Sequence, residues 1–176
     1  MIFTETKLAG AYIIEPERFT DERGFFARAF DQEAFAARGL NAAIVQCNIS
    51  YNRLRGTLRG MHFQAAPHAE TKLIRCTAGA IYDVLVDLRP NSATFCQWVG
   101  VELSADNRRL LYVPEGLAHG LQTLTDDTEV FYQMGAPYVA EAARGVRYSD
   151  PAFGIEWPLP VTAIATRDRD YEDFRW

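Results

Sequence analysis

Hydrophobic positions from Ala42 onward fall in short runs that do not repeat at helical spacing. The runs are rich in valine, isoleucine, leucine and aromatic residues, and clusters of proline, glycine, asparagine and aspartate separate them. Short strands at this spacing are typical of a mainly β sandwich, jelly roll or barrel. Strands are predicted within Thr71–Cys76, Ala80–Leu88, Cys96–Leu103, Arg109–Val113, Gly120–Leu124 and Glu129–Met134.

One segment, from Phe30 to Gly39, has the pattern of a short helix. Asp31 can cap its start, and Phe30 and Phe35 have the spacing of a hydrophobic staple. Arg38 followed by Gly39 is typical of a helix end. No long linker or repeat interrupts the chain, so we expect one domain over residues 1–176. It would comprise an N-terminal arm (about 1–40) with this helix, a barrel (about 41–150) and a C-terminal segment (151–176).

Two predicted strands carry polar groups on a face where a packed core would have apolar ones. Alternation along the strands places Asp83 and Asp87 on one face with Leu85, and Tyr132 on the same face as Val130. Such a face is either exposed to solvent or lines a barrel interior that holds a ligand. Alternation alone favours the exposed face.

Composition and charge exclude some partners. The formal net charge of -5 and the pI near 5.2 argue against nucleic acid, although a local cationic pocket for a small anion is compatible with them. No apolar run reaches the ~20 residues needed to span a membrane, and the N-terminus does not resemble a signal peptide. We expect a cytoplasmic protein. Cys47, Cys76 and Cys96 match no metal or redox spacing, and each is expected to be a buried, inert thiol.

The three histidines are the first candidates for chemistry. A β-barrel with His62, His68 and His119 could hold a metal, and metal-binding cupins use a His-x-His pair. The second position of that pair is Gln64 here, which argues against a bound metal. Motifs for acyl transfer, phosphate loops and dinucleotides are absent from the sequence. Proton transfer by a histidine remains possible, although a lone histidine is more often structural.

Several runs along the chain match one known family. They are Asp21–Phe26, Gly56–Gln64, Lys72–Arg75, Asp83–Pro90, Ser92–Thr94 with Trp98, Pro114–Gly120, Asp150-Pro151 and Gly154–Pro158. In this order, and over nearly the whole chain, they resemble the dTDP-4-dehydrorhamnose 3,5-epimerases. The resemblance implies a cupin jelly-roll barrel with short flanking helices, a homodimer, and catalysis without a metal or other cofactor. It implies inversion of C3 and C5 of a nucleotide-linked 4-keto-6-deoxyhexose, by deprotonation to an enolate and reprotonation from the other side. The implied reaction converts dTDP-4-dehydro-6-deoxy-D-glucose to dTDP-4-dehydro-L-rhamnose.

The resemblance also implies a role for individual residues. His62 would be the base, Tyr132 the acid, Asp168 the group that orients His62, and Lys72 the cation against the C4 oxygen. Asp83 would lie behind the base or serve as a structural strand residue. The residues implied for the substrate are Arg23, Arg59 and His119 for the diphosphate or sugar, Gln46 and Asn48 for the base end, Tyr138 for stacking on the base, Phe26 for lining the base pocket, and Arg167. Phe19 is expected to pack in the core.

The sequence departs from the family pattern at Arg28 and Ala143, where glutamates are usual, and at Arg167, where lysine is usual. Alternatives therefore stay open: inversion of C3 only, or a GDP- or CDP-linked sugar. A cupin that binds a sugar nucleotide without turning it over, and a metal-dependent cupin oxygenase or isomerase, are the remaining alternatives.

Overall fold

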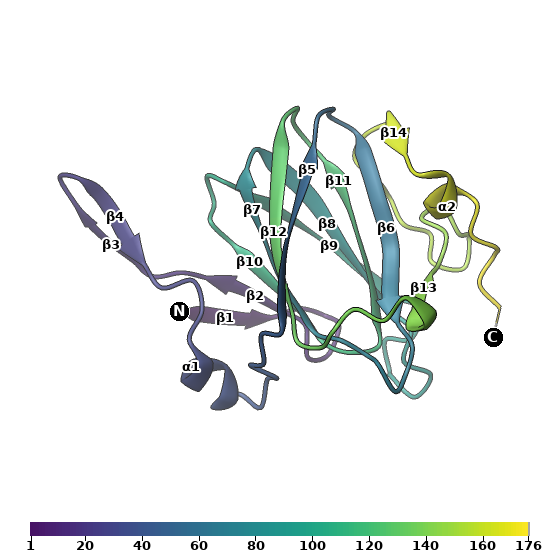
Figure 1. Cartoon of the computed structure of the whole chain (residues 1–176), viewed down its shortest axis with the longest axis horizontal. Coiled ribbons are helices and arrows are strands. Elements are labelled where there is room, and N and C mark those ends of the chain that lie inside the picture. Colours follow the sequence, from purple (N-terminus) through teal and green to yellow (C-terminus); the bar gives the residue numbers. More distant parts are fainter. Residues whose placement is uncertain (176) are drawn as a thin grey trace.

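Two β-sheets face one another in the computed structural model, which describes residues 1–175 (Figure 1). The first sheet has the strand order β1 (Ile2–Glu5), β2 (Tyr12–Glu15), β10 (Leu110–Val113), β7 (Lys72–Ala78), β12 (Thr128–Met134), β5 (Gln46–Asn52). The second has the order β13 (Ala143–Gly145), β6 (Thr57–Gln64), β11 (Leu117–Thr123), β8 (Ala80–Asp87), β9 (Trp98–Ser104), with β14 (Ala163–Ile164) parallel to β6. The predicted mainly β jelly-roll fold is confirmed, and each predicted strand segment overlaps an observed strand.

Short elements flank the sheets. They are the hairpin β3 (Arg18–Asp21) and β4 (Gly24–Ala27), the helices α1 (Gln32–Ala36) and α2 (Thr166–Arg169), and the 3-10 helix η1 (Ala140–Ala142). The predicted helix is α1: Asp31 accepts a hydrogen bond from the Ala34 N–H, and the rings of Phe30 and Phe35 lie 5.1 Å apart. None of the helices in residues 1–175 is long and apolar enough to cross a membrane.

The segment expected to form an N-terminal arm is divided between two environments. Strands β1 and β2 extend the first sheet, because β2 pairs with β10. The β3–β4 hairpin projects away from both sheets (Figure 1). Phe19 on this hairpin is 69% exposed, so the expectation that it packs in the core is wrong. The hairpin contacts the turn between β9 and β10 through Arg18, and its aromatic side chains remain at the surface.

The core lies between the sheets and is formed by the inward faces of their strands. Its central cluster includes Ile74, Leu85, Leu103 and Leu111, all fully buried or nearly so. Burying one such side chain contributes about 1.5–3 kcal/mol. The cluster packs side chains from strands of both sheets against one another.

The polar face of β8 is buried rather than exposed, which corrects the expectation from alternation. Asp83 and Asp87 both have 0% of their surface exposed. Asp87 accepts hydrogen bonds from Arg89, Ser92 and Thr94. Burial alone would raise the pKa of Asp87, but these hydrogen bonds hold it well below its ordinary value. A carboxylate with this many donors can be buried without a net penalty.

The cysteines differ from one another in exposure. Cys76 is buried as expected, and burial raises the pKa of its thiol to about 11. Cys47 is exposed, because it lies on the outward face of β5 at the edge of the first sheet, so the expectation of burial is wrong for it. Cys96 is partly exposed.

Candidate active site

A cavity of about 700 Å³ lies between the two sheets. This volume is in the range of small-molecule sites. Most of the predicted site residues line it: Arg59, His62, Lys72, His119, Tyr132, Tyr138, Arg167 and Asp168. The structure thus brings together residues that span more than half the length of the chain.

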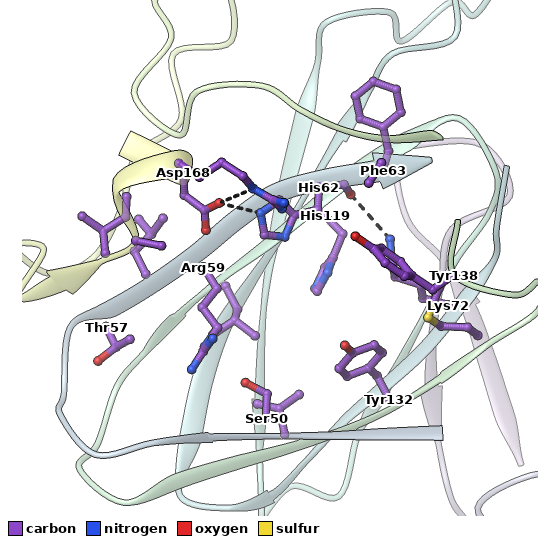
Figure 2. A pocket seen from close by; sticks show the side chains of 18 of the residues that line it. Ser50, Thr57, Arg59, His62, Phe63, Lys72, His119, Tyr132, Tyr138 and Asp168 are labelled. Atoms are coloured by element: carbon purple, nitrogen blue, oxygen red, sulfur yellow. Dashed lines mark hydrogen bonds and ion pairs between the residues drawn. The ribbon is translucent and has the colours of Figure 1, made fainter. Parts of the chain in front are cut away.

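His62 on β6 is paired with Asp168 on α2 (Figure 2). The Nε2 atom of His62 lies 2.7 Å from Asp168 Oδ1, and the other oxygen of Asp168 accepts the Gly60 N–H at 3.1 Å. Burial alone would raise the pKa of Asp168, but the hydrogen bonds from His62 and Gly60 hold it below its ordinary value of 3.8. An ionised carboxylate only accepts hydrogen bonds, so His62 Nε2 carries the proton and Nδ1 has a free lone pair.

Glycine is required where β6 passes β11. A Cβ atom on Gly60 would lie 2.4 Å from the Cα of Gly120, and the φ of Gly60 is +122°. Both the close approach and the left-handed backbone favour glycine. This contact fixes the part of β6 that presents His62 and donates the Gly60 N–H to Asp168.

Tyr132 reaches the cavity from the opposite sheet, because it lies on β12 while His62 lies on β6 (Figure 2). Burial raises the pKa of the Tyr132 hydroxyl above its ordinary value of 10.0, and the charge of Arg59 lowers it by less. The hydroxyl is therefore protonated at neutral pH. The cavity has a proton acceptor on one wall and a proton donor on the other.

Lys72 on β7 is held by a carboxylate that the sequence reasoning missed. Its Nζ donates to Glu70 Oε1 at 2.5 Å and lies 3.5 Å from the carbonyl oxygen of His62. The side chains of Lys72 and Glu70 are 10% and 3% exposed. A signal was present in the sequence, since two residues that are two positions apart in an extended segment point to the same side.

A second histidine–carboxylate pair lies in the same cavity wall. His119 on β11 has its Nε2 2.6 Å from Asp83 Oδ1, and it is the cross-strand neighbour of His62. Asp83 therefore contacts His119 and not the predicted base, which corrects one of the two roles considered for it.

Arg59 and Tyr138 lie along the wall of the cavity. Arg59 Nε donates to the buried Asn52 side chain at 2.6 Å, which holds the guanidinium in one orientation. Tyr138 has 55% of its surface exposed, and its backbone N–H donates to Gln46 Oε1. Gln46 does not line the cavity itself.

Three further predicted residues lie outside the cavity lining. Asn48 is on β5, and its amide contacts Met134 Sδ at 3.5 Å. Arg23 and Phe26 are on the β3–β4 hairpin, where Arg23 pairs with Asp21 and Phe26 is 68% exposed. Within one chain, the structure does not bring this hairpin to the cavity.

Gln64, which occupies the position of a metal-binding histidine in other cupins, is engaged in structural hydrogen bonds. Its amide donates to the His68 and Pro137 carbonyls, and its Oε1 accepts the Val139 N–H. In residues 1–175 no group of three histidine, cysteine, aspartate or glutamate side chains is arranged to hold a metal ion.

Tyr171, which follows α2, is a further residue that the sequence did not indicate. Its ring contacts the His62 ring edge-on, with centroids 6.4 Å apart. A Cβ atom on Gly145 would lie 2.2 Å from this ring, so only glycine leaves room for it. The C-terminal segment therefore supports His62 through both Asp168 and Tyr171.

Known proteins similar to this chain belong to one enzyme family. Residues 5–175 match the family described as dTDP-4-dehydrorhamnose 3,5-epimerase. The chain belongs to this family. The enzyme of that name from Sinorhizobium fredii is 44% identical over 164 residues, which cover 93% of this chain and 84% of the relative. The family assignment makes the protein an isomerase of the carbohydrate epimerase class.

Solved structures of related epimerases share the fold. The Bacillus anthracis dTDP-4-dehydrorhamnose 3,5-epimerase, with TDP and PPi bound, is 43% identical with a TM-score of 0.94 and coverage of 98% and 99%. ChmJ, a 3'-monoepimerase from Streptomyces bikiniensis in complex with dTDP-quinovose, is 30% identical with a TM-score of 0.88 and coverage of 96% and 85%. The matching family and the relatives at 43–44% identity are 3,5-epimerases, whereas the monoepimerase is 30% identical.

Proposed function

We propose that this epimerase inverts both C3 and C5 of a dTDP-linked 4-keto-6-deoxyhexose, with His62 as the base and Tyr132 as the acid. The observation that carries the proposal is the placement of these two groups on opposite walls of one cavity. Inversion needs a proton removed from one face of the sugar ring and returned to the other. A base and an acid on one wall would exchange the proton without inverting the carbon.

The proton-transfer step follows from the geometry of His62. The C–H bond next to the C4 ketone breaks, its proton moves to Nδ1 of His62, and its electron pair forms the enolate. Asp168 stabilises the resulting imidazolium through the hydrogen bond at Nε2. The Tyr132 hydroxyl then gives its proton to the carbon from the other face, and solvent restores both side chains.

Lys72 holds the negative charge that develops on the C4 oxygen. Of its three N–H groups, one bonds Glu70 and one lies toward the His62 carbonyl, which leaves one for the substrate. Loss of one such donor typically removes about 2.7–4 kcal/mol of transition-state stabilisation.

The nucleotide end of the substrate is assigned to the cationic and aromatic residues of the cavity. Arg59 and His119 suit the diphosphate, Tyr138 suits stacking on the base, and Arg167 adds a cation at the rim, where it is 61% exposed. Of the departures from the family pattern, Arg28 lies away from the proton-transfer set and pairs with Asp31 at the start of α1. Ala143 lines the cavity, and Arg167 Nε lies 3.7 Å from Asp168 Oδ1.

Solvent deuterium exchange tests this function. With dTDP-4-dehydro-6-deoxy-D-glucose in heavy water, we expect label at both C3 and C5. Label at C3 alone would make the protein a 3-epimerase like ChmJ, and no label would support a binding protein without turnover. Competition by dTDP, GDP, CDP and UDP in the same assay identifies the nucleotide, and dTDP is expected to compete best.

We also propose a homodimer in which the β3–β4 hairpin of one chain completes the cavity of its partner. Three large apolar side chains, Phe19, Phe26 and Ile49, are 69%, 68% and 66% exposed, and exposed apolar surface is typical of protein–protein interfaces. The hairpin carries Arg23, which is paired only with the neighbouring Asp21 among the described residues. A partner's cavity is a site where both Arg23 and Phe26 would be covered.

Co-expression of two inactive variants tests the homodimer. R23A leaves the variant's own His62 intact, and H62N leaves its own hairpin intact. A mixed dimer then contains one complete site, so activity should return to about a quarter of that of the wild type at equal expression. Activity no higher than that of either variant alone would contradict the shared site.

We infer a cytoplasmic location for this enzyme. The three cysteines are free thiols, as is usual where glutathione keeps cysteines reduced. Fractionation of the producing cell, with a known periplasmic or secreted protein as the control, checks the location.

A further inference from the structure

Glu70 makes one hydrogen bond among the described residues, and its partner is Lys72. The carboxylate is nearly fully buried at the cavity wall, and its second oxygen, Oε2, has no hydrogen-bond partner in residues 1–175. A buried carboxylate with a single bond is expensive to maintain and contributes little to folding. Such a group is expected where function requires it.

Lys72 would be poorly placed without this contact. Its side chain has four rotatable bonds, and free rotation would spread the ammonium over many positions. The bond to Glu70 at 2.5 Å and the neighbouring His62 carbonyl at 3.5 Å restrict it to one. A donor that is fixed before the reaction stabilises developing charge better than one that must reorganise.

From this geometry we infer that Glu70 is a positioning residue that holds Lys72 against the C4 oxygen of the substrate. The inference rests on the proposed role of Lys72. Glu70 touches no reacting atom; it acts through the ammonium. Its position two residues before Lys72 places both side chains on the cavity side of the segment that leads into β7.

Two substitutions at Glu70 distinguish the position of its carboxylate oxygen from its charge. E70D keeps the charge but withdraws the oxygen by about 1.5 Å, whereas E70Q keeps an oxygen in place and removes the charge. Because a misplacement of about 1 Å can lower a rate by ~10²-fold, we expect E70D to lower kcat for exchange at C3 and C5 by roughly 10- to 100-fold. E70Q should lose less than about tenfold in kcat, and KM should change little in either variant.

Combination with K72A tests whether Glu70 acts through the lysine. If it does, K72A/E70D is no slower than K72A alone, because the positioned group is already absent. Losses that multiply would overturn the inference, as would E70D at the wild-type rate or E70Q as slow as E70D. E115Q, a change at an exposed carboxylate outside the cavity, is the matched control.

Thermal melting and dTDP binding show that each variant is folded. Should E70D not fold, E70L repeats the test, because it fills the space without an acceptor and is expected to lose at least tenfold in kcat. An E70L enzyme with wild-type kcat would refute the positioning role. All rates are taken relative to wild type, so a wild-type protein that exchanges no label would contradict the proposed function and not the role of Glu70.

Discussion

The cavity contains two histidine–aspartate pairs that are nearly identical in geometry and different in support. His62 and His119 are cross-strand neighbours, and each has its Nε2 within 2.7 Å of a buried carboxylate. Asp83 is part of β8, which lies directly beside the strand of His119. Asp168 comes from α2, which is four residues long and lies outside both sheets.

One pair is therefore formed within a single sheet, and the other depends on the C-terminal segment that carries α2. The His119 side chain is 13% exposed and its carboxylate is fully buried, so the strands of the sheet fix both partners. The His62 side chain is 36% exposed, and its orientation depends on the docking of the C-terminal segment. Under the proposed function, the same chemical pair serves a binding group that needs a fixed position and a base that must meet the substrate.

Replacement of the two histidines should give the largest difference in kinetics between the two pairs. H62N removes the base, and we expect kcat for deuterium exchange to fall by about 10²–10⁴-fold while dTDP binding is kept. H119N removes a group assigned to the diphosphate, so KM should rise more than kcat falls. Steady-state kinetics gives kcat and KM for both variants, and thermal melting shows that each is folded. Equal effects of the two variants on kcat would contradict the separate roles.

Replacement of the carboxylates should give the next largest contrast. In D168N an amide can donate to Nε2 and favour the wrong tautomer of His62, so kcat should fall by roughly 10²-fold. D83N weakens the hold on His119, and a lost hydrogen bond of this kind corresponds to about a tenfold rise in KM. The kcat and KM values of the two variants are the readout, and a loss of kcat in D83N as large as in D168N would refute the assignment.

Displacement of Tyr171 should disturb the His62–Asp168 pair and leave the His119–Asp83 pair unchanged. G145A places a methyl group where the Tyr171 ring lies, at 2.2 Å. Because the ring contacts His62 and not His119, we expect kcat to fall roughly tenfold with little change in KM. Y171A should show the same loss, and the double variant no more than either. A double variant whose loss of kcat equals the product of the two single losses would show that Gly145 and Tyr171 act independently.

Acid pH should weaken the stabilisation that comes from Asp168. Folding lowers the pKa of Asp168 below 3.8, so the unfolded chain binds more protons in this range. The carboxylate therefore stabilises the protein above about pH 4, and the effect fades as the pH falls through the lower folded value. Unfolding free energies of wild type and D168N should differ at pH 7, and the difference should shrink as the pH falls below about 4. A difference that grows on acidification would contradict the lowered pKa.

Strand positions and the α1 cap could be predicted from the sequence because both depend on local patterns. Alternation placed Asp83 and Asp87 on one face, but it could not show that the face is covered, since the covering strands come from elsewhere in the chain. The pairing of His62 with Asp168 joins residues 106 positions apart, and no local rule indicates it. Family motifs supplied that pair. The two-residue spacing of Glu70 and Lys72 is a local signal for their contact, whereas Tyr171 is visible only through its contact with His62.

Arg23 and Phe26 show a different limit of the sequence. Family motifs implied that they contact the substrate, yet a single chain leaves them on an exposed hairpin that projects away from both sheets (Figure 1) and does not line the cavity. In the proposed homodimer, a motif would indicate the residues that meet the substrate without indicating which copy of the chain supplies them.

The distance along the chain between His62 and Asp168 has a consequence for biosynthesis. Every strand of both sheets except β14 is complete by Gly145, whereas the carboxylate of the base pair is made only at residue 168. A ribosome-bound chain can therefore fold most of its barrel while it still lacks the carboxylate that pairs with His62. We expect catalytic competence to appear as the last step of synthesis, so that a prematurely terminated chain binds sugar nucleotides without converting them.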